Sequence, residues 1–337
     1  HPCDGFAGEA VELTGFQAVC AIVAHGARGT TALADLRHLD LGSTLKDLTA
    51  VAHLEQLTSL TVSGLEAVAG AERLVNLKHL EHLRSKVTDW RPLQRESALE
   101  TVYLSGDYGR GTNRSATDLG WLGHHPGVKQ LDLRQFSADY SVLGTLAELE
   151  VLEMHDCTQT NTASAPTPLH DITWLEGNAR LKRLVIPNAA VSDLRSLTGL
   201  VELEAVRLAH WRLDAYSKGA SVIAGRAVSD LSPLAHATGL TELVLVAGSR
   251  LSGPLNSLTP IQHLTALEKL VLGSTNNEIT DLNAFAELTG LKTLVLYGFD
   301  KIEHVDALGA LTHLETLALT GATSLVDTSA LAGCTAL

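Results

Sequence analysis

The stretch LEKLVLGSTNNEITDLNAFAELTGLKTLVL, residues 267–296, contains the pattern that decides the fold. It begins and ends with LxxLxL, a short segment in which leucines alternate with other residues. Alternation with a period of two is typical of a β-strand with one buried side. Between the two copies lies ITDLNAF (279–285), where an aspartate precedes further apolar residues. One such unit cannot bury its apolar side alone, so the pattern predicts stacking against similar units.

This unit repeats along nearly the whole chain. Neighbouring copies without an insertion are 20 to 24 residues apart. About twelve copies of LxxLxL begin at residues 36, 57, 77, 99, 128, 149, 181, 203, 240, 267, 291 and 314. Stacked copies place their strands side by side in one parallel sheet and their leucines in a continuous core. We therefore predict an α/β solenoid of about twelve coils over residues 33–337, with the sheet on the concave face and short 3₁₀ or helical segments on the convex side.

Six aspartates occupy one position in the second half of the repeat. They are Asp89, Asp118, Asp171, Asp193, Asp230 and Asp281. A carboxylate at the start of a short helical turn accepts hydrogen bonds from backbone N–H groups that have no other partner. The periodicity predicts that these aspartates cap turns, and it disfavours a metal-binding or catalytic role for them.

Composition and motifs exclude several function classes. The chain has 25 Lys and Arg against 38 Asp and Glu, a formal charge of −13, which argues against a broad nucleic-acid surface. No run of 18 apolar residues exists, so no membrane span is expected. HGARGTT (25–31) lacks the lysine of a phosphate-binding loop, and we expect no cofactor.

Cysteine and histidine residues point to no catalytic or metal site either. The four cysteines have no zinc-site spacing; free thiols are expected, with a Cys3–Cys20 disulfide as the alternative. HDC (155–157) is the single Cys/His/Asp cluster, and no positioned base or third ligand can be argued for it. Several histidines recur at one repeat phase, which indicates solvated positions: His53, His236, His263 and His313. We expect no catalytic residue and no bound metal.

The pattern LxxLxLxxNx(I/V)xDLxxL resembles the leucine-rich repeat, in the SDS22-like subclass that includes internalins; the return segment VSDLSPL (228–234) is an example. The family's turn asparagine is mostly replaced here, with Cys157, Ala189 and Asp300 near that position and Asn277 as a survivor. This resemblance implies a non-catalytic module that binds a protein partner or a flanking domain of the same polypeptide.

The composition of the repeats also resembles the C-terminal repeat regions of bacterial NACHT/STAND ATPases, which are related to NLR immune sensors. That resemblance implies a cytoplasmic sensor or autoinhibitory region in anti-phage innate immunity. Two alternatives stay open: an internalin-like secreted or surface adhesin, and a regulatory scaffold subunit that binds a partner enzyme. The sequence does not indicate an oligomeric state.

The first and last coils of a repeat array each expose an apolar end that needs a cap. GEAVELTGFQAVCAIVAHGARG (8–29) predicts an amphipathic or buried helix, so residues 1–32 are expected to form an N-terminal helical cap. At the other end, ALAGCTAL (330–337) begins another coil. We expect the solenoid to continue beyond residue 337, or a partner to cover that end.

Four insertions fall at the same phase of the repeat, after the strand and before the aspartate segment. They span residues 105–117, 155–168, 209–227 and 247–257. Insertions at one phase project from one edge of a solenoid and provide a recognition surface. The candidate contacts in them are Tyr108, Arg110, Trp211, Arg212, Tyr216 and Lys218.

The residue between the two leucines of LxL points to the opposite side from the core. This series is polar and acidic in the first half of the chain and valine-rich in the last third. An exposed apolar stripe indicates a docking surface, although valine also suits strands for its β-propensity alone. The candidate partner-binding residues on this face are Tyr103, Arg134, Val244, Val246, Val271, Val295 and Tyr297.

Overall fold

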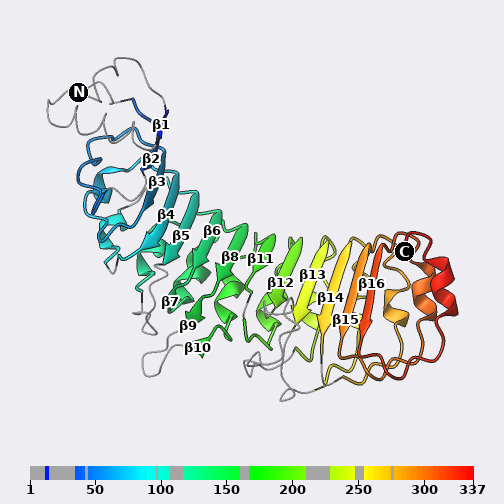
Figure 1. Ribbon diagram of the computed structural model, residues 1–337. Coiled ribbons are helices and arrows are strands. Elements are labelled where there is room, and N and C mark those ends of the chain that lie inside the picture. Colours follow the sequence, from blue (N-terminus) through cyan, green and yellow to red (C-terminus); the bar gives the residue numbers. More distant parts are fainter. Residues whose placement is uncertain are drawn as a thin grey trace. The chain divides into compact units, whose positions relative to one another are not determined.

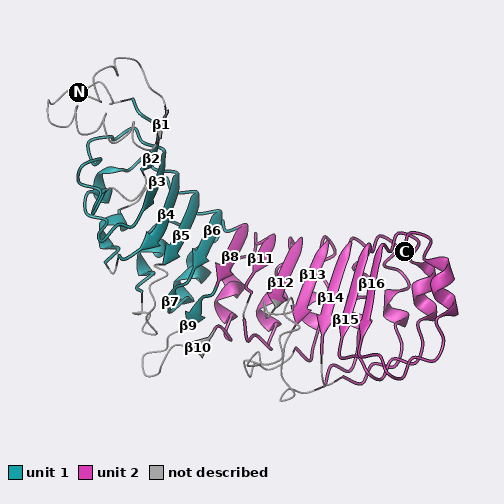
Figure 2. Ribbon diagram, viewed as in Figure 1, with its two compact units in different colours: residues 1–149, 156–166 teal, residues 150–155, 167–337 magenta. Residues whose placement is uncertain are grey.

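The computed structural model describes residues 12–14, 35–41, 45–87, 89–95, 98–106, 117–159, 167–187, 189–209, 228–246, 254–274 and 277–337. Short parallel strands follow one another along the chain, each returning through a turn that often contains a 3₁₀ segment (Figure 1). The chain forms two compact units, residues 1–149 with 156–166 and residues 150–155 with 167–337 (Figure 2). Within the described ranges, no helix has both the length and the apolar character needed to cross a bilayer.

Unit 1 contains a parallel sheet in which strand order follows chain order. Its strands are β1 (Glu12–Thr14), β2 (His38–Leu41), β3 (Ser59–Ser63), β4 (His79–Ser85), β5 (Thr101–Gly106) and β6 (Gln130–Arg134). The register follows the repeat spacing: Leu39 on β2 pairs with Leu60 on β3, and Leu60 pairs with Leu80 on β4. Two further short strands, β7 (Ser137–Ala138) and β9 (Thr158–Gln159), pair with each other beside this sheet.

Unit 2 repeats the same arrangement. Its sheet contains β8 (Val151–His155), β11 (Arg183–Val185), β12 (Ala205–Ala209), β13 (Glu242–Val246), β14 (Lys269–Gly273), β15 (Thr293–Tyr297) and β16 (Thr316–Thr320). A further two-residue strand, β10 (Thr167–Pro168), also belongs to this unit. Every described strand of the two main sheets except β1 coincides with a predicted LxL segment, which confirms the twelve-coil prediction.

Leucines of successive repeats form the core. In β14, Leu270 and Leu272 are 0% and 2% exposed, whereas Val271 between them is partly exposed. The alternation therefore has the predicted sense, with leucines inward and the intervening residues on the other side of the sheet. We call that other side the strand face. Burial of each leucine contributes roughly 1.5–3 kcal/mol, so a core with few aromatic side chains is sufficient.

The return path of most repeats contains a 3₁₀ segment. These segments are η2 (Ala71–Arg73), η3 (Arg91–Leu93), η4 (Gly120–His124), η5 (Ser141–Thr145), η6 (Thr173–Gly177), η7 (Arg195–Leu197), η9 (Ser232–Leu234), η10 (Thr259–Ile261), η11 (Asn283–Phe285), η12 (Asp306–Ala310) and η13 (Ser329–Gly333). All six predicted aspartates accept a hydrogen bond from the backbone N–H two residues later, at 2.8–3.0 Å. Asp47, Asp139 and Asp327 make the same bond, which the sequence analysis missed.

The capping geometry differs in one respect from a helix N-cap. Each of the six predicted carboxylates lies one residue before the N-cap and accepts a hydrogen bond from the first N–H of the 3₁₀ turn, as Asp193 does from Arg195 at 3.0 Å before η7. The bond therefore closes an Asx turn, in which the side chain substitutes for a backbone carbonyl. This bond fixes the direction in which the chain enters each return segment.

The predicted helix over residues 8–29 is wrong where the structure describes that region. Glu12–Thr14 form β1, which pairs in parallel with β2 and places Leu13 opposite Leu39. The alternating Val11-Glu12-Leu13-Thr14 fits the strand period as well as a helical one, and pairing with the open edge of β2 favours the strand. The other residues of the predicted cap lie outside the described residues.

Four buried ring side chains contact one another in a column within the leucine core of unit 1. His82 takes the place of a leucine in β4 and is 1% exposed, and its ring centroid is 5.8 Å from that of Trp90. Trp90 stacks on Trp121 at 5.5 Å, and Trp121 meets His125 edge-on at 5.5 Å. His125 Nε2 lies 2.6 Å from the carbonyl oxygen of Leu93.

Candidate functional site

The strand face of unit 2 carries the largest set of predicted contact residues that the structure describes. Strand pairing puts Val244, Val271 and Val295 in register on β13, β14 and β15. Each of these valines is partly exposed. Ala318 continues the row on β16, and Arg207 precedes it on β12. We call Val244, Val271 and Val295 the valine stripe.

Val246 does not belong to this exposed surface, contrary to the prediction. Its side chain is 7% exposed because it lies over Gly273, its partner on β14. A Cβ on Gly273 would stand 2.6 Å from Val246 Cγ1, so the valine occupies the space that a side chain at 273 would need. Gly273 pairs in turn with Tyr297 on β15, and Tyr297 is partly exposed beside the valine stripe.

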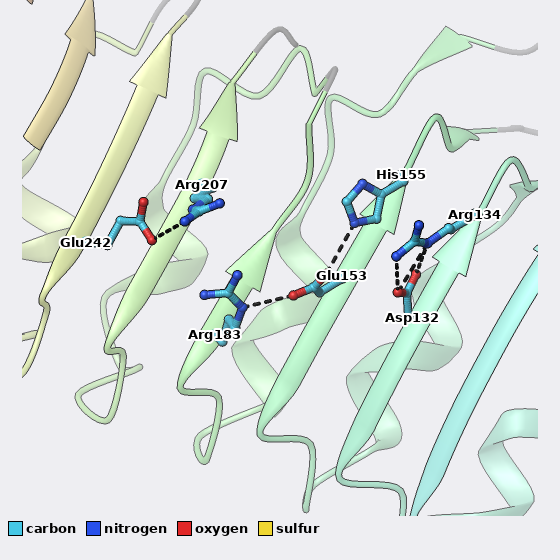
Figure 3. A network of polar contacts seen from close by, with 7 residues as sticks. All are labelled: Asp132, Arg134, Glu153, His155, Arg183, Arg207 and Glu242. Atoms are coloured by element: carbon cyan, nitrogen blue, oxygen red, sulfur yellow. Dashed lines mark hydrogen bonds and ion pairs between the residues drawn. The ribbon is translucent and has the colours of Figure 1, made fainter. Parts of the chain in front are cut away.

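Ion pairs formed by side chains of β12, β13 and β14 lie beside the valine stripe, and Figure 3 shows the pair of Arg207 with Glu242. Arg207 donates from Nη2 to Glu242 Oε2 at 2.6 Å, and Lys269 Nζ lies 3.0 Å from Glu242 Oε1. Burial acts to raise the pKa of Glu242, but the hydrogen bonds from these two cations outweigh it and hold the pKa below its ordinary value. Glu242 is therefore a carboxylate that orients both cations on the strand face.

A second ion pair lies further along this face, between β8 and β11 (Figure 3). Arg183 donates from Nε to Glu153 Oε1 at 2.9 Å, and His155 Nε2 is 3.2 Å from Glu153 Oε2. Burial acts to raise the pKa of Glu153 as well, and its bonds with Arg183 and His155 lower it below the ordinary value. His155, from the segment HDC (155–157), therefore belongs to a polar network with Glu153 and Arg183.

The strand face of unit 1 brings together two predicted residues from different strands. The guanidinium carbon of Arg134, on β6, lies 5.0 Å from the ring centroid of Tyr103 on β5. Arg134 also donates from Nη2 to Asp132 Oδ2 at 2.9 Å. The cation–π contact and the ion pair fix an aromatic ring and a guanidinium side by side, which are the side-chain types that anchor protein interfaces.

The insertions are only partly described, and some of their described residues pack onto the protein. Thr158 and Gln159 pair with β7, and Tyr140 Oη donates to the carbonyl oxygen of Thr158 at 3.2 Å. Leu255, near the end of the fourth insertion, is 4% exposed. The predicted contacts Tyr108, Arg110, Trp211, Arg212, Tyr216 and Lys218 lie outside the described residues.

The side chain that hydrogen-bonds the turn after the strand differs between repeats. Asn277 is 2% exposed and donates from Nδ2 to the carbonyl oxygens of Ser274 and Gly298, as a ladder residue does. In unit 1, Cys157 is buried and its Sγ donates to the carbonyl oxygen of Leu133 at 3.3 Å. Cys157 and Cys334 are both free thiols, and burial raises the pKa of Cys334. Cys3 and Cys20 lie outside the described residues.

Repeat length, strand register and the aspartate turns together define a leucine-rich-repeat solenoid, and comparison with solved structures supports this fold. An internalin from Listeria monocytogenes superposes with a TM-score of 0.64 at 21% identity, over 92% of this chain and 81% of the internalin. A leucine-rich-repeat protein of Leptospira interrogans gives a TM-score of 0.56 at 18% identity, over 89% of this chain and 73% of that one.

A third similar structure is the leucine-rich-repeat ectodomain of the Arabidopsis thaliana receptor kinase GASSHO1/SCHENGEN3, in complex with CASPARIAN STRIP INTEGRITY FACTOR 2. Its TM-score is 0.60 at 15% identity, over 90% of this chain and 38% of the receptor chain. No protein-family model matches the sequence, and no curated protein matches it significantly. These likenesses concern the fold alone.

Proposed function

We propose that this chain is a non-catalytic recognition module that binds a protein partner through the strand face of unit 2. The observation that carries the proposal is the valine stripe, with three partly exposed valines in register on neighbouring strands. β-propensity explains a valine in any one strand, but it does not explain why the apolar residues align next to oriented ion pairs. Contiguous apolar surface rimmed by polar residues is typical of an interaction site.

The geometry of unit 1 supports a second contact region on the same kind of face. Tyr103 and Arg134 are held in place by their own contact and by Asp132, so little side-chain freedom is lost when they bind. The similar receptor ectodomain of Arabidopsis was solved with CASPARIAN STRIP INTEGRITY FACTOR 2 bound. This precedent is consistent with recognition by the present chain.

Our more specific hypothesis is that the module is the sensor or autoinhibitory region of a bacterial NLR-like immune ATPase in the cytoplasm. It rests on the resemblance of the repeats to such regions. The internalin-like adhesin is the second candidate, favoured by the extent of the superposition on the Listeria structure. The complete reading frame separates the two, since a nucleotide-binding ATPase before His1 supports the sensor and a secretion leader supports the adhesin.

Site-specific photocrosslinking tests the general proposal. A photoreactive amino acid at Val271 should crosslink to a native partner, whereas the same residue at His263, which is exposed on the return path, should not. Val295→Asp should abolish the crosslink from position 271 because it places a charge in the stripe. Equal crosslinking from both positions, or crosslinking unaffected by Val295→Asp, would refute the proposal.

A further inference from the structure

Three cations and two carboxylates face the same side of the sheet in unit 2. Arg183 is paired with Glu153, while Arg207 and Lys269 share Glu242 (Figure 3 shows the two arginine pairs). Glu242 and Lys269 are partners in the pairing of β13 with β14, so the second group spans three neighbouring strands. This group lies directly beside the valine stripe.

The cations of these pairs are more accessible than the carboxylates. The side chains of Arg183, Arg207 and Lys269 are 36%, 40% and 43% exposed. The side chains of Glu153 and Glu242 are 24% and 13% exposed. A ligand that approaches this face therefore meets positive charge first, on a chain whose formal charge is −13. This local reversal of sign is the feature that selects a partner.

The spacing of the sheet relates the positive group to the valine stripe. Neighbouring strands are about 4.8 Å apart, so Val271 lies roughly 10 Å and Val295 roughly 14 Å from Arg207 across the sheet. An extended segment rises about 3.3 Å per residue, and alternate side chains point to the same side. If one side chain of such a segment lies over Arg207, the side chains two and four residues further along the segment would therefore reach the valine stripe.

From this arrangement we infer that the strand face of unit 2 docks an extended segment of a partner protein that carries an acidic side chain. The carboxylate contacts Arg207 and Lys269, and apolar side chains two and four residues away pack on the valine stripe. The inference rests on the proposed function and specifies the chemistry of the partner. An RNA partner fits less well, because the stripe supplies apolar contact where successive phosphates would need cations.

Selection of displayed random seven-residue peptides on the full chain tests the inference. Selected peptides should be enriched in Asp or Glu, with apolar residues two and four positions away. A selected peptide should bind Arg207→Gln/Lys269→Gln at least about tenfold more weakly, because charge-assisted contacts are lost. Lys269→Gln alone keeps the Arg207–Glu242 pair, so it tests the charge effect if the double variant fails to fold.

Lys301→Gln is the matched control. Lys301 is 45% exposed and pairs with Glu278 at 2.6 Å, but it follows β15 and lies outside the strand face. Its replacement should leave peptide affinity unchanged. Selected peptides without acidic residues that still lose binding with Val271→Asp would overturn the inference and leave the proposed function standing. Peptides indifferent to Val271→Asp would overturn both, and an RNA oligonucleotide that displaces the peptides would overturn the inference.

Discussion

Replacing His82 with leucine should remove a pH-dependent component of stability from unit 1. His82 occupies a leucine position in β4, is 1% exposed, and accepts a hydrogen bond at Nε2 from the backbone N–H of Leu65 at 3.3 Å. Burial lowers the pKa of His82 from its ordinary 6.5 to about 4. The folded chain therefore holds this imidazole neutral at pH values where the unfolded chain protonates it.

The sign and size of the effect follow from this difference in pKa. Below pH 6.5 the unfolded state binds the proton that the folded state excludes, so the free energy of unfolding falls as the pH falls. The loss grows between pH 6.5 and about 4 and is constant below that range. A difference of about 2.5 in pKa, at 1.36 kcal/mol for each pKa unit, amounts to about 3 kcal/mol.

Urea unfolding of the wild type and His82→Leu at pH 7.5 and pH 4.5 measures the effect. Groups that titrate in both proteins cancel in the comparison, so the wild type should lose about 2–3 kcal/mol more than the variant. Leucine also removes the acceptor for the N–H of Leu65, but this cost is the same at both pH values. An identical loss in the two proteins would refute the assignment of a buried neutral histidine.

Three further changes test separate parts of the fold. Asp230→Ala removes the bond to the backbone N–H of Ser232 and should lower the free energy of unfolding by about 1 kcal/mol, measured in urea, whereas Asp230→Asn should cost less. Asn277→Ala leaves the carbonyl oxygens of Ser274 and Gly298 without this donor and should cost about 1–3 kcal/mol. Gly273→Ala displaces Val246 and should destabilise by roughly 1–3 kcal/mol in thermal unfolding; a variant as stable as wild type would contradict the close approach.

Much of the architecture could be predicted because one short pattern recurs with a fixed period. The spacing of LxxLxL gives strand positions directly, and the strand from Lys269 to Gly273 coincides with its predicted copy. The aspartate turns were predictable for the same reason, since each aspartate has one local partner two residues away. Both are local consequences of sequence that tertiary contacts reinforce.

Features that depend on contacts between repeats could not be predicted in the same way. The burial of Val246 depends on the missing side chain of Gly273 in the next repeat, 27 residues later. The strand at Glu12–Thr14 depends on the open edge of β2, which a helical pattern in isolation does not reveal. Glu242 and Lys269 do not occupy the position between the two apolar residues of LxL, so the repeat pattern alone did not indicate that they lie on the strand face beside Arg207.

A comparison of adjacent residues in β14 tests the central claim most directly. Leu270 is 0% exposed and Val271 is partly exposed on the opposite side of the strand. Leu270→Ala should lower the free energy of unfolding by about 2–5 kcal/mol. Val271→Asp should change it by less than about 1 kcal/mol while abolishing partner or peptide binding. The opposite result would be that Leu270→Ala is as stable as wild type while Val271→Asp unfolds the chain and loses binding only for that reason. This result would contradict the proposed division between core and recognition face.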